Sequence, residues 1–323
     1  MKRIHFAVSA GALALAGPAL AQGQACDRAC LRQAADAYVA ALVAHDPSKA
    51  PLAAGVVTVE NAKRLAAGQG LWQSLSGGPS EFHIYVPDPV SHQIGYMAVM
   101  QESGKPVQVG IRLKLDGRRI IEAEHMVVHQ ISPAGLANLS GTPMPLLQQP
   151  VAEGWRDSRG RLLSIAASYY DALDNNNGRL APFADTCERR ENGIQTARNP
   201  VRRPVATNTN PTADPSFALL GAMGCAAQLD TQLFTYITRI DDRRVGIADE
   251  ETGLVFGMSH FRHAQTTKTF PIFGVPGAAT RTVNNEPFDL PAIHIFKIFG
   301  GQIQEIEAMG FTTAYNSPTG WEQ

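Results

Sequence analysis

The sequence predicts an α+β fold in which one unit, a helix followed by a curved antiparallel sheet, occurs twice in tandem. The first observation is an internal repeat: a shift of 131 residues gives ten identities over the 31 ungapped positions 31–61. A second match, at a shift of 183, relates residues 114–126 to 297–309 and pairs Lys114 with Lys297. The difference between the two shifts gives the second copy 52 more residues than the first.

The second observation is an apolar stripe on a helix at the start of each copy. The stripe is Leu31, Ala34, Ala35, Tyr38, Ala41 and Leu42 in the first copy, and Leu162, Ile165, Ala166, Tyr169, Ala172 and Leu173 in the second. This spacing places the six side chains on one helical face. Each helix therefore needs a sheet against which to bury that face.

The third observation is a series of strand-like runs after each helix, separated by turns rich in Gly, Pro and Asp. The expected strands are residues 56–60, 81–86, 93–101, 106–115 and 119–129 in the first copy, and 233–240, 244–249, 254–263, 292–299 and 302–309 in the second. A helix followed by antiparallel strands is typical of the α+β class.

The first 21 residues predict a cleaved secretory signal that is not part of the fold. An apolar run over residues 6–20 follows Lys2 and Arg3, and small residues at 19–21 precede Gln22, where the mature chain would begin. Without Lys2 and Arg3, 26 of the 28 basic residues remain against 29 acidic ones, a net charge of about -3. No later run reaches the roughly 18 apolar residues of a membrane span. We expect a periplasmic or secreted protein.

The repeat and the composition also suggest domain boundaries. We expect a first domain over residues 26–131, a Pro- and Gly-rich linker over 132–158, and a second domain over 159–316. The linker shows no periodicity, which is typical of a surface connection. The extra residues of the second copy fall mainly at 197–216 and 264–290, and loops of this length are usually lids or binding segments.

Four cysteines lie in the expected mature chain, and export would place them in an oxidising compartment. They permit three pairings. We favour Cys26 with Cys30 and Cys187 with Cys225, because each pair stays within one half of the chain. Buried free thiols are the alternative. The cysteines and histidines lack the paired spacing that zinc usually requires, so no metal is expected.

Both copies carry the same order of short motifs after the helix. The first has Pro-Leu-Ala at 51–53, Glu-Asn at 60–61 and Leu-Lys-Leu-Asp-Gly-Arg-Arg-Ile at 113–120, and the second has Pro-Phe-Ala at 182–184, Glu-Asn at 191–192 and Phe-Lys-Ile-Phe-Gly-Gly-Gln-Ile at 296–303. This order resembles the NTF2-like (SnoaL-like) superfamily over nearly all of residues 26–312, taken as two tandem copies. Residues 236–244 and 249–254 also resemble a group of secreted tandem NTF2-like proteins without a firmly assigned activity.

The resemblance implies two tandem NTF2-like conical barrels, each a curved antiparallel sheet packed against N-terminal helices. In this superfamily the cone encloses a pocket that serves cofactor-free isomerases, dehydratases, cyclases and lyases, and also many copies without catalysis. The fold therefore implies a shape and leaves the reaction open.

The second copy holds the ionisable groups that we take as candidate catalytic residues. These are His260, His294, Tyr236 and Arg190. Each histidine ends or interrupts an apolar row on one strand face, where a neutral imidazole can act as a general base. Tyr236 would donate a hydrogen bond to a developing oxyanion, and Arg190 or Arg239 would stabilise it by charge. The alternative for the histidines is a hydrogen-bonded core or interface position, and for Tyr236 and the arginines a role as partners of nearby acids.

The expected substrate-binding residues combine apolar and polar groups. They are Glu191, Asn192, Arg239, Phe256, Met258 and Phe296. The Glu191-Asn192 pair recurs at Glu60-Asn61, so a structural role at the turn after the strand is the alternative for it.

Other polar groups receive a weaker interpretation. A second pocket in the first copy would use His83, Tyr85, Tyr96, Arg112 and His125, but the strands that carry them are mainly typical of packing surface. The charges that the repeat retains, Lys114 and Lys297 with Glu122, Glu124, Glu305 and Glu307, are expected to be exposed on strands.

Composition and missing motifs narrow the function. The chain is 44% hydrophobic and its charges balance, which excludes a disordered chain and a polyanion binder that acts through bulk charge. No phosphate loop, GxSxG elbow, HExxH or Rossmann fingerprint occurs, so no cofactor is expected, and arginines that alternate with acids argue against nucleic acid.

We expect an exported cofactor-independent lyase, dehydratase or isomerase that acts by acid–base chemistry on a small apolar or aromatic molecule. The resemblance makes lignin-derived diaryl compounds an example. The alternative is a non-catalytic protein that binds a small molecule or forms a homodimer through its sheet faces.

Overall fold

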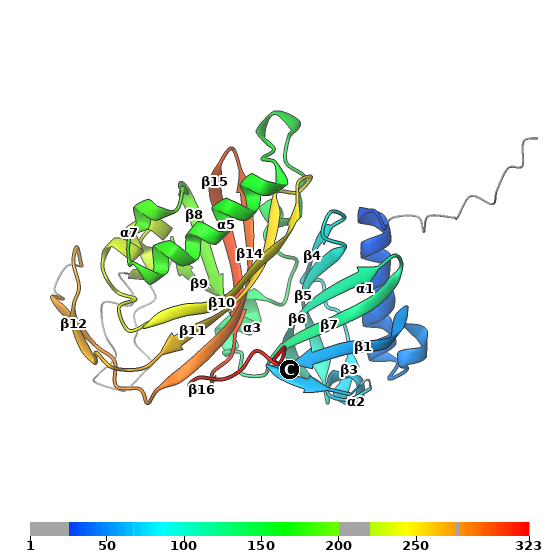
Figure 1. Cartoon of the computed structure of the whole chain (residues 1–323). Helices are drawn as coiled ribbons and strands as arrows, with labels where there is room; N and C mark the ends of the chain where they lie inside the picture. The colour runs from blue at the N-terminus through cyan, green and yellow to red at the C-terminus, as the bar shows by residue number, and fades with distance from the viewer. Residues whose placement is uncertain (1–25, 67, 200–219, 276–277, 323) are drawn as a thin grey trace, which may run out of the picture.

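The computed structural model describes residues 26–66, 68–199, 220–275 and 278–322. These residues form two curved, mainly antiparallel sheets of seven strands, each with one long helix, and a two-stranded ribbon (Figure 1). The predicted α+β class is confirmed. The predicted signal peptide and most of the 197–216 loop lie outside the described residues. A membrane span would need a longer apolar helix than any that the described residues contain.

The first copy begins with α1 (Arg28–Val43), where the Asp27 side chain caps the helix by accepting from the Cys30 N–H. The elements that follow are η1 (Pro47–Lys49), β1 (Leu52–Glu60), β2 (Lys63–Leu65), α2 (Leu71–Ser74), β3 (Leu75–Gly77), β4 (His83–Asp88), β5 (Gln93–Glu102), β6 (Lys105–Asp116) and β7 (Arg119–Val128). The strand order is β2-β1-β7-β6-β5-β3, with β4 also beside β5, and β1 is parallel to β7. The predicted apolar stripe of α1 is buried against this sheet.

The second copy repeats this arrangement. Its elements are α5 (Arg159–Asp174), η3 (Gly178–Leu180), β8 (Phe183–Glu191), β9 (Ile194–Ala197), α7 (Cys225–Asp230), β10 (Arg239–Asp249), β11 (Leu254–His263), β14 (Phe288–Phe299), β15 (Gln302–Gly310) and β16 (Thr313–Ala314). The order is β10-β11-β14-β15-β8-β9, with β8 parallel to β15. The strand register follows the repeat, because Lys114 faces Glu122 and Lys297 faces Glu305.

Two segments differ from the expectation. The strand predicted at 233–240 begins only at Arg239, because local hydrogen bonds hold the preceding residues in turns: Thr231 Oγ1 accepts from the Leu233 N–H, and the Asn176 side chain accepts from the Phe234 N–H. The 264–290 loop contains a ribbon of β12 (Thr269–Pro271) and β13 (Thr280–Thr282).

The expected surface linker is folded in part. It contains α3 (Pro133–Asn138), α4 (Pro145–Gln148) and η2 (Glu153–Trp155). Leu139 and Leu147 are buried in the apolar cluster between the sheets, so this segment adds to the core.

Both favoured disulfides are confirmed. Cys26 bonds to Cys30 at the start of α1, and Cys187 on β8 bonds to Cys225 at the start of α7. The second bond links α7 to β8.

The two sheets pack on each other through the faces that their own helices leave uncovered (Figure 1). A Cβ at Gly95 would overlap Phe256, and a Cβ at Gly110 would overlap Ile293, so both glycines permit close approach of the sheets. The members of each pair occupy matching positions in the two copies. The copies are therefore related by a pseudo-twofold axis through this interface.

Two reciprocal ion pairs obey the same symmetry. Arg28, the first residue of α1, lies 2.7 Å from Asp249 at the end of β10. Arg159, the first residue of α5, lies 2.8 Å from Asp88 at the end of β4. The alternative hypothesis of a homodimer used the sheet faces, and one face of each sheet packs on the other sheet within the chain.

Candidate functional site

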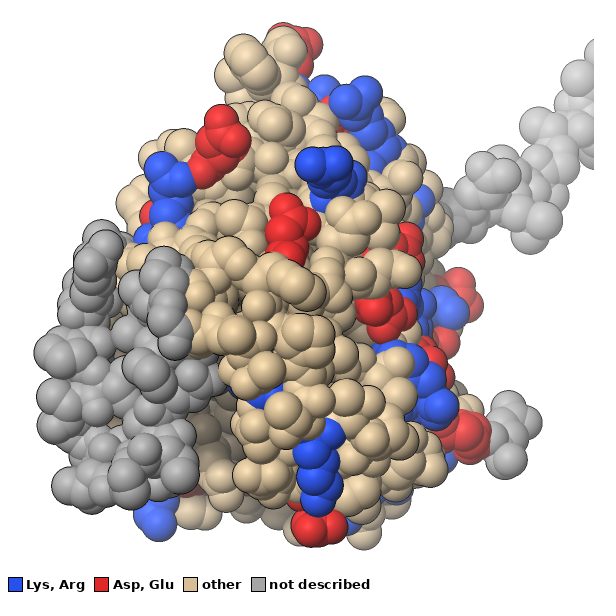
Figure 2. Space-filling view, turned by 90° about the vertical axis from the view of Figure 1, so that its left-hand side faces the viewer, with Lys and Arg blue, Asp and Glu red and all other residues tan. Residues whose placement is uncertain are grey.

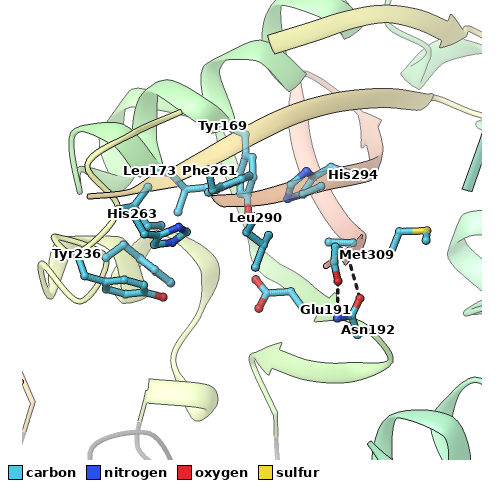
Figure 3. A pocket seen from close by; sticks show the side chains of 15 residues that line it. Tyr169, Leu173, Glu191, Asn192, Tyr236, Phe261, His263, Leu290, His294 and Met309 are labelled. Carbon is cyan, nitrogen blue, oxygen red and sulfur yellow. Dashed lines mark hydrogen bonds between the residues drawn. The ribbon is translucent and has the colours of Figure 1, made fainter. Parts of the chain in front are cut away.

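A cavity of about 160 Å³ lies between α5 and the sheet of the second copy (Figure 3). Its apolar walls include Leu173, Phe261, Leu290, Ala292 and Met309, and its polar lining is Tyr169, Glu191, Asn192, Tyr236, His263 and His294. A void of about 150 Å³ can hold a benzene molecule. The cavity therefore has room for one aromatic ring.

The same space is filled in the first copy. There the cross-strand pairs Val109–Val127 and Ile111–His125 point from β6 and β7 toward α1. The His125 ring is fully buried and occupies the space between Tyr38 of α1 and Glu60 of β1.

In the second copy the matching pairs are Ala292–Gly310 and His294–Ala308 on β14 and β15. Three of the four positions hold a smaller side chain than in the first copy. The histidine lies on β7 in the first copy and on β14, the counterpart of β6, in the second. The cavity exists because this volume is missing.

The first copy shows how the retained groups interact. The carboxylate of Glu60, which can only accept, lies 3.1 Å from Nδ1 of His125, and the Tyr38 hydroxyl lies 2.8 Å from Nε2 of the same ring. Glu60 also accepts from the Leu71 N–H over 2.9 Å. These contacts form a closed, structural network.

In the second copy, Arg189 joins the matching tyrosine and glutamate. Its Nε lies 2.9 Å from Glu191 Oε1, and its buried positive charge also acts on the Tyr169 hydroxyl. Burial raises the pKa of Tyr169 to about 12, while Arg189 acts in the opposite direction. Thr196 and Gln228 hold the buried guanidinium in place.

His294, on β14, lines the cavity and is surrounded by aromatic rings. Its Nδ1 is 3.3 Å from the Tyr170 hydroxyl, and its ring is stacked 5.8 Å from Phe296. Burial, and then the charge of Arg189, lower its pKa to about 3. The imidazole is therefore uncharged at neutral pH.

Tyr236 and His263 form the other end of the cavity. The His263 ring stacks 4.0 Å from Phe288 and 5.4 Å from Tyr236. Burial lowers the pKa of His263 to about 4 and raises that of Tyr236, so the phenol keeps its proton. In Figure 3 the hydroxyls of Tyr169 and Tyr236 and the carboxylate of Glu191 point toward the same space.

The structure brings together only part of the predicted site. Tyr236, His294, Glu191 and Asn192 line the cavity. Asn192 exchanges two hydrogen bonds with the Gly310 backbone, each 3.0 Å long, as Asn61 does with Val127, so the structural interpretation holds for the asparagine.

The prediction for His260, Phe256 and Met258 is wrong, because they lie on the opposite face of β11 from the cavity. Phe256 and Met258 pack against the first sheet. His260 lies with them on this inter-copy side, 3.6 Å from Asp242, and burial lowers its pKa. The predicted alternation along β11 is present, but the face that carries these three residues lies against the first copy.

Three further residues lie outside the cavity lining. Arg190 pairs with Glu188 and Glu305 on the inter-sheet face. The Arg239 side chain is 51% exposed and pairs with Asp241. Phe296 is core beside His294.

Sequence reasoning missed Arg189 and His263. Arg189 neighbours the chosen Arg190 on the other strand face. His263 shares its strand face with Phe261, but both faces of β11 are buried and apolar, so no local signal in the sequence singles out this face.

The polar groups proposed for a first-copy pocket are divided between two faces. Tyr96 and His125 lie on the face covered by α1, as does Tyr85, which hydrogen-bonds Asp36 and packs edge-on with His83. Arg112 lies on the inter-sheet face and pairs with Glu122 and Glu124.

The expectation of exposed strand charges is wrong for Lys297, Glu305, Glu307 and Glu124, which are buried because the other copy or the linker covers them. Lys297 Nζ donates to the carbonyls of Gln149 and Thr252, both at 2.6 Å. Burial lowers its pKa to about 8.

The described part of the chain contains no group of three or more His, Cys, Asp or Glu residues arranged to hold a metal ion. On the visible face of the second copy, basic and acidic side chains are interspersed (Figure 2).

The comparisons with known proteins concern the second copy. Residues 155–310 match the model of a family described as a domain of unknown function (DUF8021). This range extends from η2 to the end of β15 and includes the residues that line the cavity. No curated protein and no solved structure matches the chain.

Proposed function

We propose that this protein is an exported, cofactor-independent lyase, dehydratase or isomerase with two tandem NTF2-like domains and one active site, the cavity of the second copy. One observation carries the proposal: the carboxylate of Glu191 and the hydroxyls of Tyr169 and Tyr236 converge on an apolar cavity whose counterpart in the first copy is filled. The sequence of the leader and the two disulfides support export.

The substrate is a small, mainly apolar molecule with one ring. Cavity walls of aromatic and aliphatic side chains favour an aromatic or unsaturated ring. The volume of about 160 Å³ matches one ring and is too small to enclose both rings of a diaryl compound.

Proton abstraction next to a carbonyl is the reaction that these groups suit. Glu191 takes the proton as the C–H bond breaks, and the electron pair passes to the carbonyl oxygen. The hydroxyls of Tyr236 and Tyr169 donate hydrogen bonds to that oxygen, since burial keeps both phenols protonated. Return of the proton from Glu191 to another carbon completes an isomerisation. Transfer of that proton to a β-hydroxyl, which leaves as water while the enolate electron pair forms the C=C bond, completes a dehydration.

His294 is assigned a different role from the general base that we expected. A pKa of about 3 makes this imidazole a weak base at neutral pH, so it forms an uncharged wall of the site. Arg189 fixes Glu191 and Tyr169 in position. General acid–base transfer of this kind contributes roughly two to four orders of magnitude in rate.

The test is deuterium exchange in D₂O with phenylacetone, a single-ring ketone with an acidic C–H, followed by mass spectrometry of the recovered ketone. We expect the wild-type protein to accelerate exchange and Glu191→Gln to lower the rate by roughly 100-fold or more. Glu188→Gln is the matched control, because it lies on the same strand and pairs with Arg190 outside the cavity. A protein that binds the ketone without exchanging it would be the non-catalytic binder of the alternative.

A further inference from the structure

We infer that the ligand of the second-copy cavity is a planar five- or six-membered ring with a hydrogen-bond donor on one edge and an acceptor on the opposite edge. The inference takes only the location of the site from the proposed function. It names a class: azoles that carry an N–H donor and a ring-nitrogen acceptor have such edges.

The first copy provides the template, because an imidazole ring occupies the matching space. The His125 ring bridges Tyr38 and Glu60, with 2.8 Å between the Tyr38 hydroxyl and Nε2 and 3.1 Å between Nδ1 and the Glu60 carboxylate. Nδ1 donates to the glutamate, because a carboxylate only accepts, and Nε2 shares a hydrogen bond with the tyrosine hydroxyl. Two opposite edges of one planar ring thus satisfy both groups.

The second copy retains the tyrosine and the glutamate and lacks the ring. Ala308 faces Glu191 in the strand pairing that places His125 opposite Glu60. Tyr169, Glu191 and Ala308 all line the cavity. A free ring can therefore take the place of the missing histidine side chain.

Arg189 leaves both polar groups able to bind such a ring. Burial keeps the Tyr169 phenol protonated, so its hydroxyl has a hydrogen to donate to an acceptor on the ligand. Glu191 Oε1 pairs with Arg189, and Glu191 Oε2 has no hydrogen-bond partner within the described residues. The ligand edge near Tyr169 must accept, and the edge near Glu191 must donate.

Aromatic side chains make up much of the cavity wall. Tyr169 and Phe261 lie 5.3 Å and 5.6 Å from the His294 ring, measured between ring centroids. Aromatic side chains in this arrangement stack on or meet the edge of a planar ring.

The test is calorimetric titration of the mature chain with 4-methylimidazole at alkaline pH, where this analogue of a histidine side chain is uncharged. 3-Methylthiophene is the control, because it has the same size and lacks both hydrogen-bonding edges. We expect 4-methylimidazole to bind at least about tenfold more tightly, as two added hydrogen bonds predict. Equal affinity for the two rings, or no binding of 4-methylimidazole, overturns the inference.

Two variants locate the binding. Ala308→His restores the first-copy side chain and is expected to abolish binding, and Ala292→Val narrows the same cavity from the neighbouring strand if Ala308→His does not fold. His125→Ala is expected to create a second site of similar selectivity in the first copy. Unchanged binding in a folded Ala308→His or Ala292→Val protein contradicts the assignment.

This experiment separates the two proposals. Selective ring binding without deuterium exchange on phenylacetone supports the ligand class and removes the enzymatic proposal. Deuterium exchange on phenylacetone without selective ring binding supports the enzymatic proposal and removes the ligand class.

Discussion

The two copies share one strand order and one pair of facing groups, but the space between these groups holds a histidine ring in the first copy and is part of a cavity in the second. Tyr38 and Glu60 correspond to Tyr169 and Glu191, and the difference lies in the side chains between them. In the first copy His125 closes a buried network. In the second, Ala308 leaves space, and Arg189, which is not among the residues that line the cavity, pairs with Glu191. The comparison teaches that loss of side-chain volume can turn a structural network into a candidate site without a new motif.

The largest expected effect comes from opening the first copy. His125→Ala removes a fully buried ring and leaves Tyr38 and Glu60 without their partner, so we expect a loss of about 3–5 kcal/mol in the free energy of unfolding. His294→Ala enlarges an existing cavity and removes one long hydrogen bond. We therefore expect its loss in the free energy of unfolding to be about 1–2 kcal/mol smaller than that of His125→Ala. Urea unfolding measures both. Equal losses would mean that the copies are equally packed.

The second prediction concerns one position that has opposite electrostatics in the two copies. Burial raises the pKa of Glu124, but hydrogen bonds and charges from Arg244 and Arg112 outweigh it and lower the pKa overall. Glu307 is buried with less compensation, because only the charge of Arg190 opposes its burial, and its pKa rises to about 8.

The sign of each effect follows from these directions. Glu124 stabilises the fold above its unfolded pKa, and this stability is lost as pH falls through the lower folded pKa. Glu124→Gln should therefore cost about 2–3 kcal/mol at neutral pH and less in acid. Glu307 increasingly destabilises the fold as pH rises from its unfolded value of 4.5 to about 8. Glu307→Gln should gain about 1–2 kcal/mol at pH 8 and nothing below pH 4.5.

Thermal unfolding of both variants across this pH range provides the measurement. The two curves should diverge from wild type in opposite directions as pH rises. Parallel curves would show that the two glutamates have the same environment in solution.

The smallest expected effect comes from partly filling the second copy. Ala292→Val installs the residue that the first copy has at this position, Val109. We expect a gain of about 0.5–1 kcal/mol in the free energy of unfolding, because the added methyl groups enter existing space. Val109→Ala, the reverse change, should cost more than this gain. A loss of stability in Ala292→Val would show that the cavity is already closed at this wall.

Much of the fold could be predicted from local patterns. The repeat, the stripes of α1 and α5 and both disulfides required only spacing along the chain, because a helix or a strand imposes its period on neighbouring residues. The candidate site was predicted in part: Tyr236, Glu191 and His294 line the cavity, whereas the arginine on β8 was placed one residue too far along the chain.

Only the tertiary structure decided which strand face meets a ligand and which meets the other copy. Every residue of β11 is buried, so alternation carries no difference in polarity that could distinguish the faces of His260 and His263. The same packing buries Lys297 and Glu307, whose charge predicts exposure. The cavity depends on volume that is missing at Ala292, Ala308 and Gly310, and a small residue in a sequence does not reveal whether neighbouring side chains fill the space beside it.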